Sequence, residues 1–138
     1  MFEDRISAKA LIATFAGYFV ISLVAVAVLV TVWRPHDLST SQLRQLAETD
    51  SVLLIWQNVL GILLTTAAGG AACQLSGRKG LKNSTVFGAI IALFGVLGIY
   101  LHPDHPVWML AGRLVLPIPL SMLGGWICLH WARTRLSH

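Results

Sequence analysis

Four polar residues lie in or beside long apolar runs of this chain and are its candidates for chemistry. Gln57 and Asn58 are neighbours near the start of one run, Arg113 lies inside another, and Asp104 comes just before that second run. Ionisable side chains inside a membrane-spanning segment are rare, and by default they mark a functional site. We therefore treat Arg113, Asn58, Gln57 and Asp104 as the polar intramembrane candidates.

Two interpretations of Arg113 stay open. In the first, it is a structural clamp, held between helices by Asp104, Asn58 or a backbone carbonyl. In the second, it binds a small anion or a lipid headgroup that faces the outer leaflet. We prefer the clamp, because interhelical hydrogen bonds are common in membrane proteins even though each averages only about 0.6 kcal/mol.

Two prolines, Pro117 and Pro119, follow Arg113 within about two helical turns. Proline has no backbone N–H and kinks a helix interior, so we expect a kink in the middle of the membrane. Broken helices at the midplane form transport sites in some membrane proteins. Bending a helix around its neighbour is the commoner use.

The sequence lacks the residue sets that catalysis or metal binding requires. His102 and His105 flank a proline in an outer loop, and no Cys or Glu completes a tetrahedral set. Cys73 and Cys128 form no CxxC pair. Because no nucleophile accompanies a base and no phosphate loop is present, we expect no enzymatic activity, no catalytic residue, no cofactor and no metal.

Composition places the candidate residues in a lipid bilayer. The 138 residues are 56 % hydrophobic and only 12 % charged, whereas soluble domains carry about 25 % charged residues. A helix needs about 20 apolar residues to cross the hydrocarbon, and four runs qualify, at 10–33, 52–75, 84–101 and 107–131. We predict an all-α integral membrane protein with one domain, 1–138, made of four transmembrane helices.

Between the first two runs, Ser39 and Gln42 form the pattern of a capping box. This pattern predicts a short helix that lies on the outer membrane surface or leads directly into the second run. A simple interfacial connector is the role we expect for it.

The basic residues orient the predicted bundle. Lys and Arg gather on the N-terminal tail, after the second run and on the C-terminal tail: Arg5, Lys9, Arg78, Lys79, Lys82, Arg133 and Arg135. Positive charge is retained on the cytoplasmic side. We expect both termini to be cytoplasmic, in the inner (plasma) membrane of a bacterial cell, and we expect no nucleic-acid partner.

Small residues at helical spacing predict how the helices pack. In lipid, helices associate through close backbone contact at such positions. The candidate packing glycines are Gly61, Gly69, Gly70, Gly88, Gly95, Gly124 and Gly125.

The second and fourth runs also resemble each other. At an offset of 55 residues, Gly69-Gly70 matches Gly124-Gly125, and Cys73 matches Cys128. The first and third runs match more weakly, Gly17 falling on Gly88. These matches favour a parallel two-fold repeat of helix pairs about an axis along the membrane normal. The alternative is that any two glycine-rich membrane helices ending in arginine look alike.

Three functions are compatible with these patterns. The one we prefer is a non-catalytic accessory or self-associating subunit of a membrane complex, with the bilayer, copies of itself or other membrane subunits as partners. The second is a small oligomeric transporter or channel with a polar site near Arg113 and Asn58. The third is an immunity-type or regulatory membrane protein.

Overall fold

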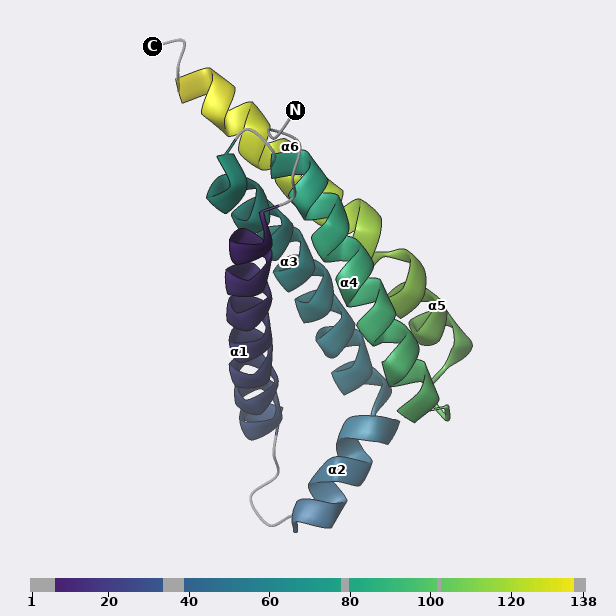
Figure 1. Ribbon diagram of the computed structural model, residues 1–138. Coiled ribbons are helices and arrows are strands. Elements are labelled where there is room, and N and C mark those ends of the chain that lie inside the picture. The colour runs from purple at the N-terminus through teal and green to yellow at the C-terminus, as the bar shows by residue number, and fades with distance from the viewer. Residues whose placement is uncertain (1–6, 34–38, 78–79, 102, 136–138) are drawn as a thin grey trace.

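The computed structural model describes residues 7–33, 39–77, 80–101 and 103–135. These residues form helices and no strand, as predicted from the apolar runs (Figure 1). In chain order the helices are α1 (Ala8–Trp33), α2 (Thr40–Thr49), α3 (Ser51–Ser76), α4 (Gly80–Leu101), α5 (Val107–Val115) and α6 (Pro117–Arg135).

Three of these helices, α1, α3 and α4, are long and apolar enough to cross a membrane. At a rise of 1.5 Å per residue, the 26 residues of α3 extend about 39 Å, more than the hydrocarbon thickness of about 30 Å. The pair α5 and α6 passes the same test together, but it is bent by 46° at the break. The described chain thus holds three candidate spans, or four if the bent pair counts as one.

The predicted run 107–131 is therefore two helices. Pro117 has no N–H to give to the carbonyl of Arg113, so the regular bonding pattern stops there. Leu116 still donates to Gly112 O at 3.0 Å, and Leu120 donates to Leu116 O at 3.1 Å. Pro119 adds no second break, because it lies in the first turn of α6, where a missing N–H leaves no intrahelical bond unmade.

Helix α4 also begins earlier than hydropathy suggests, at Gly80 instead of residue 84. The polar first turn is held by hydrogen bonds that a hydropathy count does not register. The Asn83 side chain is fully buried; its Oδ1 accepts from the Ser7 backbone N–H at 3.3 Å, and its amide donates to the Ser76 hydroxyl. These contacts join the starts of α1 and α4 to the end of α3.

The backbones of α3 and α6 approach closely along a strip that we call the glycine seam, made of Gly69, Gly70 and Gly124 with their contacts. Gly125 faces α4, where a Cβ would lie within 3.0 Å of the Ser84 side chain. A Cβ on Gly69 would lie within 3.0 Å of the backbone of Ser121, and one on Gly124 would lie within 3.0 Å of the Thr66 carbonyl oxygen. Only glycine fits at such distances, which is the usual basis of tight helix pairing in lipid.

Helix α4 joins the same packing through two buried hydroxyls. Ser84 Oγ lies 2.7 Å from Gly69 O and 2.9 Å from Gly80 O, and Ser121 Oγ donates to Ser84 O at 2.5 Å. Gly88 packs against the backbone at Ile118. Because both hydroxyls have acceptors, they link three helices without an unsatisfied buried group.

Helix α1 packs against α3 and α4 with its first half only. Ala10 and Thr14 are buried there, and the ring of Tyr18 meets Phe87 edge-on at 5.6 Å. In its most apolar window, no residue of α1 is buried, and the second half lies apart from the other helices (Figure 1).

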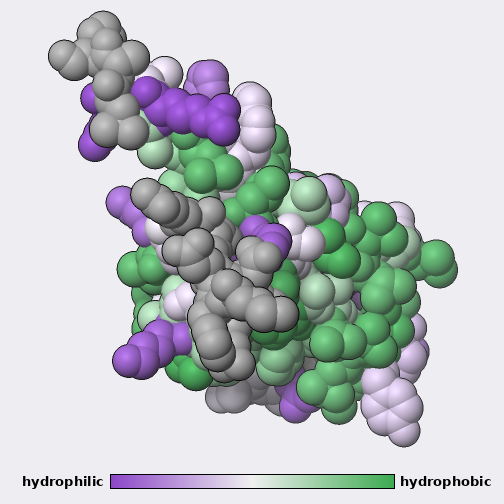
Figure 2. All heavy atoms as spheres, turned by 45° about the horizontal axis from the view of Figure 1, so that its top comes forward, coloured by the Kyte–Doolittle hydropathy of each residue, from purple (hydrophilic) through white to green (hydrophobic). Residues whose placement is uncertain are grey.

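The outer surface of the bundle is apolar, and its interior is lined by small residues. Figure 2 shows apolar side chains over the flanks and hydrophilic ones near the end where α6 finishes. Large exposed side chains such as Leu93 and Val32 contrast with buried Thr65, Ala72 and Ser121. This distribution is typical of a bundle solvated by lipid instead of water.

Candidate functional site

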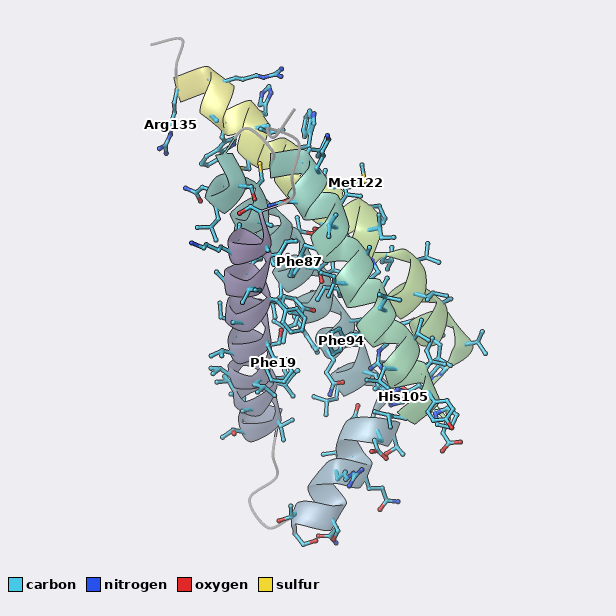
Figure 3. The ribbon with its side chains drawn as sticks, viewed as in Figure 1. Phe19, Phe87, Phe94, His105, Met122 and Arg135 are labelled. Carbon is cyan, nitrogen blue, oxygen red and sulfur yellow. The ribbon has the colours of Figure 1, made fainter. Side chains whose placement is uncertain are left out.

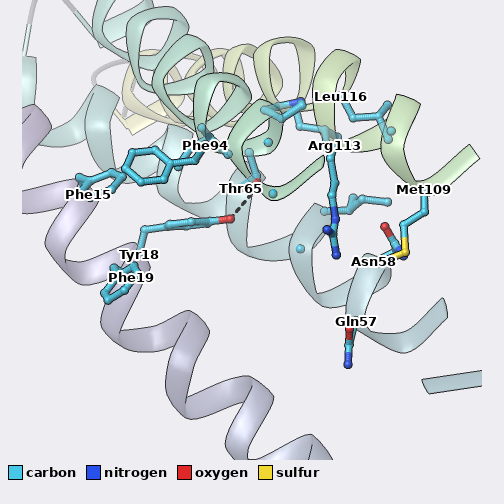
Figure 4. A pocket seen from close by; sticks show the side chains of 18 residues that line it. Phe15, Tyr18, Phe19, Gln57, Asn58, Thr65, Phe94, Met109, Arg113 and Leu116 are labelled. Carbon is cyan, nitrogen blue, oxygen red and sulfur yellow. Dashed lines mark hydrogen bonds between the residues drawn. The ribbon is translucent and has the colours of Figure 1, made fainter. Parts of the chain in front are cut away.

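A cavity of about 360 Å³ lies where the helices part beyond the glycine seam (Figure 4). Its walls come from α1, α3, α4 and the bend between α5 and α6. The cavity lies at the start of α6, where the close packing of the seam stops and the preceding α5 is bent away from α6 by 46°. A volume of this size is at the lower end of those that hold small-molecule ligands.

Three of the four polar candidates line this cavity together. Gln57 and Asn58 enter from the start of α3, and Arg113 enters from α5 (Figure 4). All three are half-buried. Arg113 and Asn58 were also grouped from the sequence, either as a clamp or as a polar site.

The fourth candidate, Asp104, lies elsewhere. It is exposed in the turn before α5 and lines a separate, polar hollow with residues of α2, among them Arg44 and Glu48. Among the described residues, no carboxylate forms an ion pair with the Arg113 guanidinium. The predicted clamp between Arg113 and Asp104 is not formed, because Arg113 lies well inside α5 and faces the cavity.

The other forms of the clamp are not formed either. Within the described residues, Arg113 makes no ion pair and no hydrogen bond through its side chain. The amide of Asn58 donates instead to the carbonyl of Leu54, one turn back on the same helix, at 2.7 Å. Arg113 is thus a cation in a mostly apolar cavity without a partner from the described chain.

Two glycines of α4 make room for Arg113. A Cβ on Gly95 would lie within 3.0 Å of the Arg113 carbonyl oxygen, so α5 approaches α4 at backbone distance. A Cβ on Gly98 would lie 3.6 Å from Nη1 of Arg113. The guanidinium therefore extends across a face of α4 that carries no side chain at this point.

Aromatic side chains form the opposite wall. Phe15 and Phe19 come from α1, and Phe94 comes from α4; the rings of Phe15 and Phe94 lie 5.2 Å apart. The hydroxyls of Tyr18 and Thr65 lie 3.5 Å from each other and join α1 to α3 at the cavity. Sequence reasoning missed this wall, although the spacing of Phe15, Tyr18 and Phe19 is that of one helix face.

Gly61 does not have the helix-packing role expected for it. Nothing lies within 4 Å of the position that its Cβ would take, and the residue lines the cavity. It therefore makes no tight helix contact here, and its missing side chain adds open space to the cavity.

The two prolines also have different positions. Pro117 is buried and lines the cavity at the break, whereas Pro119 is exposed and does not line it.

The remaining packing glycines lie outside the site. The side chains of Cys73 and Cys128 interact with each other across the glycine seam, away from the cavity.

The cavity has the composition of a binding site. It offers one cation, two amides and a pair of hydroxyls within walls that are otherwise apolar. No His, Cys, Asp or Glu is among its lining residues, and the described part of the chain contains no group of three such residues that could hold a metal ion. This arrangement can bind and orient an anion.

Comparison of the chain with models of known families, with characterised proteins and with solved structures gives no significant match.

Proposed function

We propose that this protein is a small membrane transporter that binds an organic anion in the cavity at the α5–α6 break. The observation that carries the proposal is Arg113, a cation that has no partner among the described residues and lines an apolar cavity. An Arg within the bilayer costs about 2.5–3.5 kcal/mol on insertion scales. An anionic ligand would offset this cost by pairing with the guanidinium.

The broken helix supports transport in preference to binding alone. Substrate sites of secondary transporters commonly lie at discontinuous helices near the midplane. Here the 46° break falls at Leu116, and both Leu116 and Pro117 line the cavity. A ligand bound against the break would be able to bias the angle between α5 and α6.

A membrane position with four spans and cytoplasmic termini is part of this proposal. Lys9, Lys82 and Arg133 lie at one end of the bundle, near the start of α1, the start of α4 and the end of α6 (Figure 1). Retained positive charge favours the cytoplasm for that end, as in an inner membrane. Exposed Trp56 and Trp108 near the other end fit the aromatic belt expected at an interface.

The helix between the first two spans is proposed to lie at the outer interface. In α2 the capping box of Ser39 and Gln42 is present, the Ser39 backbone N–H donating to Gln42 Oε1 at 2.9 Å. The helix continues almost directly into α3 through Asp50, whose carboxylate accepts from Val52 N–H at 2.9 Å. Its exposed Arg44 and Glu48 would face water.

We also propose that α3 and α6 are equivalent members of a parallel repeat. Gly69 meets Ser121, and Gly124 meets Thr66, the repeat-related contact. The thiols at the two equivalent cysteine positions also meet. The partners α1 and α4 follow the repeat less well: Gly17 has nothing within 4 Å of its Cβ position, whereas Gly88 is tightly packed.

A second candidate function is an accessory or self-associating subunit. The observation that favours it is the apolar window of α1, of which no residue is buried within this chain. Lipid or a neighbouring subunit would cover this face. Purification from native membranes tests the accessory form, which predicts a stoichiometric unrelated partner. A self-associating subunit and an oligomeric transporter would both purify as homo-oligomers, and they are separated by the flux measurement.

The test of the transporter is ligand-dependent stability and flux after reconstitution. Acetate, benzoate, decanoate and a benzenesulfonate would be screened in nanodiscs for a rise in the thermal midpoint, and the best anion would be followed into proteoliposomes. We expect at least one anion to stabilise the wild type and not Arg113→Gln, and we expect Arg113→Ala and Asn58→Ala to reduce its uptake. Uptake that survives both substitutions would contradict the proposal.

A further inference from the structure

We propose that the ligand of this cavity is a single-chain amphipathic anion that enters sideways from the bilayer. Its carboxylate would bind Arg113, and its one apolar chain would lie along the wall of Phe15, Phe19 and Phe94. This inference rests on the proposed function and adds the class of substrate and its route.

The polarity of the cavity is concentrated at one end. Arg113, Asn58 and Gln57 form the polar end, and Tyr18 and Thr65 are already joined to each other. The rest of the lining is apolar or glycine. A ligand that fits this lining carries one charged group and an apolar remainder, because a second polar group would be buried without a partner.

The volume limits the size of the ligand. A cavity of about 360 Å³ is near the lower end of the volumes that hold small-molecule ligands, about 300–1,000 Å³, so it suits a small ligand. Such a ligand is one medium alkyl chain or one ring system with its carboxylate. The two acyl chains of a phospholipid do not fit, although one of them could enter from a lipid whose headgroup stays outside.

Exposure of the lining residues gives the route of entry. The lining side chains that are exposed are all apolar: Phe19, Ile62, Phe94 and Leu116. Phe19 and Phe94 are 53 % and 51 % exposed, while Arg113, Asn58 and Gln57 are half-buried. An apolar rim in the middle of long apolar helices opens toward hydrocarbon, so the ligand reaches Arg113 from the lipid phase.

Binding of the carboxylate is favoured by the same surroundings. An Arg–carboxylate pair forms two parallel charge-assisted hydrogen bonds, and its attraction is stronger at low local dielectric. Gly98 leaves the Nη1 side of the guanidinium uncrowded, the nearest approach of a Cβ being 3.6 Å. Decanoate has the required charge, chain and size, and it serves as the probe.

The experiment measures binding of decanoate, decanol and acetate to the full chain in phosphatidylcholine nanodiscs. We expect decanoate to bind at least tenfold more tightly than both decanol, which lacks the charge, and acetate, which lacks the chain. Arg113→Gln should weaken decanoate binding by about tenfold or more, because hydrogen bonds to charged groups contribute about 1.5–3 kcal/mol. Arg113→Lys, which keeps the charge without the planar fork, should give an intermediate value.

A pair of glycine substitutions keeps the test valid if variants of Arg113 fail to insert. Nothing lies within 4 Å of the Cβ position of either Gly61 or Gly17, and only Gly61 lines the cavity. Gly61→Leu should fill the cavity and reduce decanoate binding by at least tenfold. Gly17→Leu is the matched control and should bind as the wild type does.

The outcomes separate this inference from the proposed function. If acetate binds as tightly as decanoate and needs Arg113, the amphipathic ligand is wrong and the anion site stands. If none of the three probes binds, or if decanol equals decanoate, the amphipathic ligand is wrong, and the anion site then stands only if benzoate or the benzenesulfonate stabilises the wild type and not Arg113→Gln. If phosphatidylglycerol in the nanodisc abolishes decanoate binding to the wild type, the occupant is a phospholipid and the single-chain ligand is wrong.

Discussion

Arg113 contributes to the stability of the protein differently from an arginine that clamps two helices together. A clamp would hold its guanidinium in hydrogen bonds, and removing it would leave buried partners unsatisfied. In the structure no described residue hydrogen-bonds or ion-pairs with it, and its surroundings are mostly apolar. The ligand-free protein therefore carries the cost of this cation without a compensating contact.

The lack of a partner among the described residues predicts whether replacing Arg113 raises or lowers the free energy of unfolding. Arg113→Leu should leave the ligand-free protein at least as stable as the wild type, with a gain of about 1 kcal/mol, because a partly desolvated charge is replaced by an apolar side chain. Reversible unfolding in mixed micelles measures it. A loss of 2 kcal/mol or more (on the scale of a broken buried pair) would restore the clamp interpretation.

The glycines show which part of the helix packing cannot be predicted from the sequence. Small-residue spacing located Gly69 and Gly124 at a helix contact, since such spacing repeats on one helix face. The same pattern included Gly61, which lies against empty space. Spacing along one helix identifies a face, and only the neighbouring helices decide whether that face meets backbone or a cavity.

Substitution by alanine should separate these two kinds of glycine. Gly61→Ala and Gly17→Ala should each stabilise the protein by about 0.5–1 kcal/mol, because alanine has the higher helix propensity. Gly124→Ala should destabilise it by about 2 kcal/mol or more, since its Cβ would meet the Thr66 carbonyl. Unfolding free energies of the three variants would be compared, and equal signs would refute the described seam.

At the scale of elements, the break between α5 and α6 shapes the site. Hydropathy predicts one span at 107–131, and the two prolines predict a kink without saying which proline makes it. The structure places the break at Leu116, directly before Pro117, which has no N–H to donate to the Arg113 carbonyl, and it places Pro119 in the first turn of α6. The effect of each proline depends on its position relative to the first residue of the helix, and the sequence predicts that first residue poorly.

The break can be tested by restoring its hydrogen bond. Pro117→Ala supplies an N–H to the Arg113 carbonyl, so α5 and α6 should straighten and the cavity should close. We expect anion binding to fall by about tenfold, which corresponds to about 1.4 kcal/mol, with no loss of thermal stability. Pro119→Ala is the control, because its missing N–H breaks no helix bond; binding reduced equally in both would contradict this account.

At the scale of the whole molecule, features that depend on local interactions could be predicted from the sequence, and features that depend on contacts between distant residues could not. Apolar length fixes α1 and α3, and the capping box fixes the start of α2, because both are local signals. The early start of α4 depends on Asn83 reaching Ser7 and Ser76. The cavity depends on α1, α3, α4 and α5 lying around one space, which no local pattern encodes. Hence Arg113 and Asn58 could be named as candidates from the sequence, and the aromatic wall could not.

The proposed orientation of the bundle in the membrane can be tested by labelling single cysteines at its two ends. In a chain whose Cys73 and Cys128 are changed to Ala, Thr40→Cys and Lys82→Cys would place single thiols at opposite ends of the bundle. A membrane-impermeant maleimide added to intact cells should label Thr40→Cys and should reach Lys82→Cys only after permeabilisation. The reverse pattern would place the basic end outside and contradict the proposed orientation.

The most direct measurement of the central claim is the site of attachment of a ligand. A decanoate analogue with a photoreactive diazirine on its chain would be added to the protein in nanodiscs, irradiated, and mapped by peptide mass spectrometry. The account predicts attachment to Phe15, Phe19, Ile62 or Phe94, reduced by excess decanoate and by Arg113→Gln. Attachment confined to the exposed second half of α1, or unchanged by either treatment, would show partitioning into lipid and contradict the cavity as a binding site.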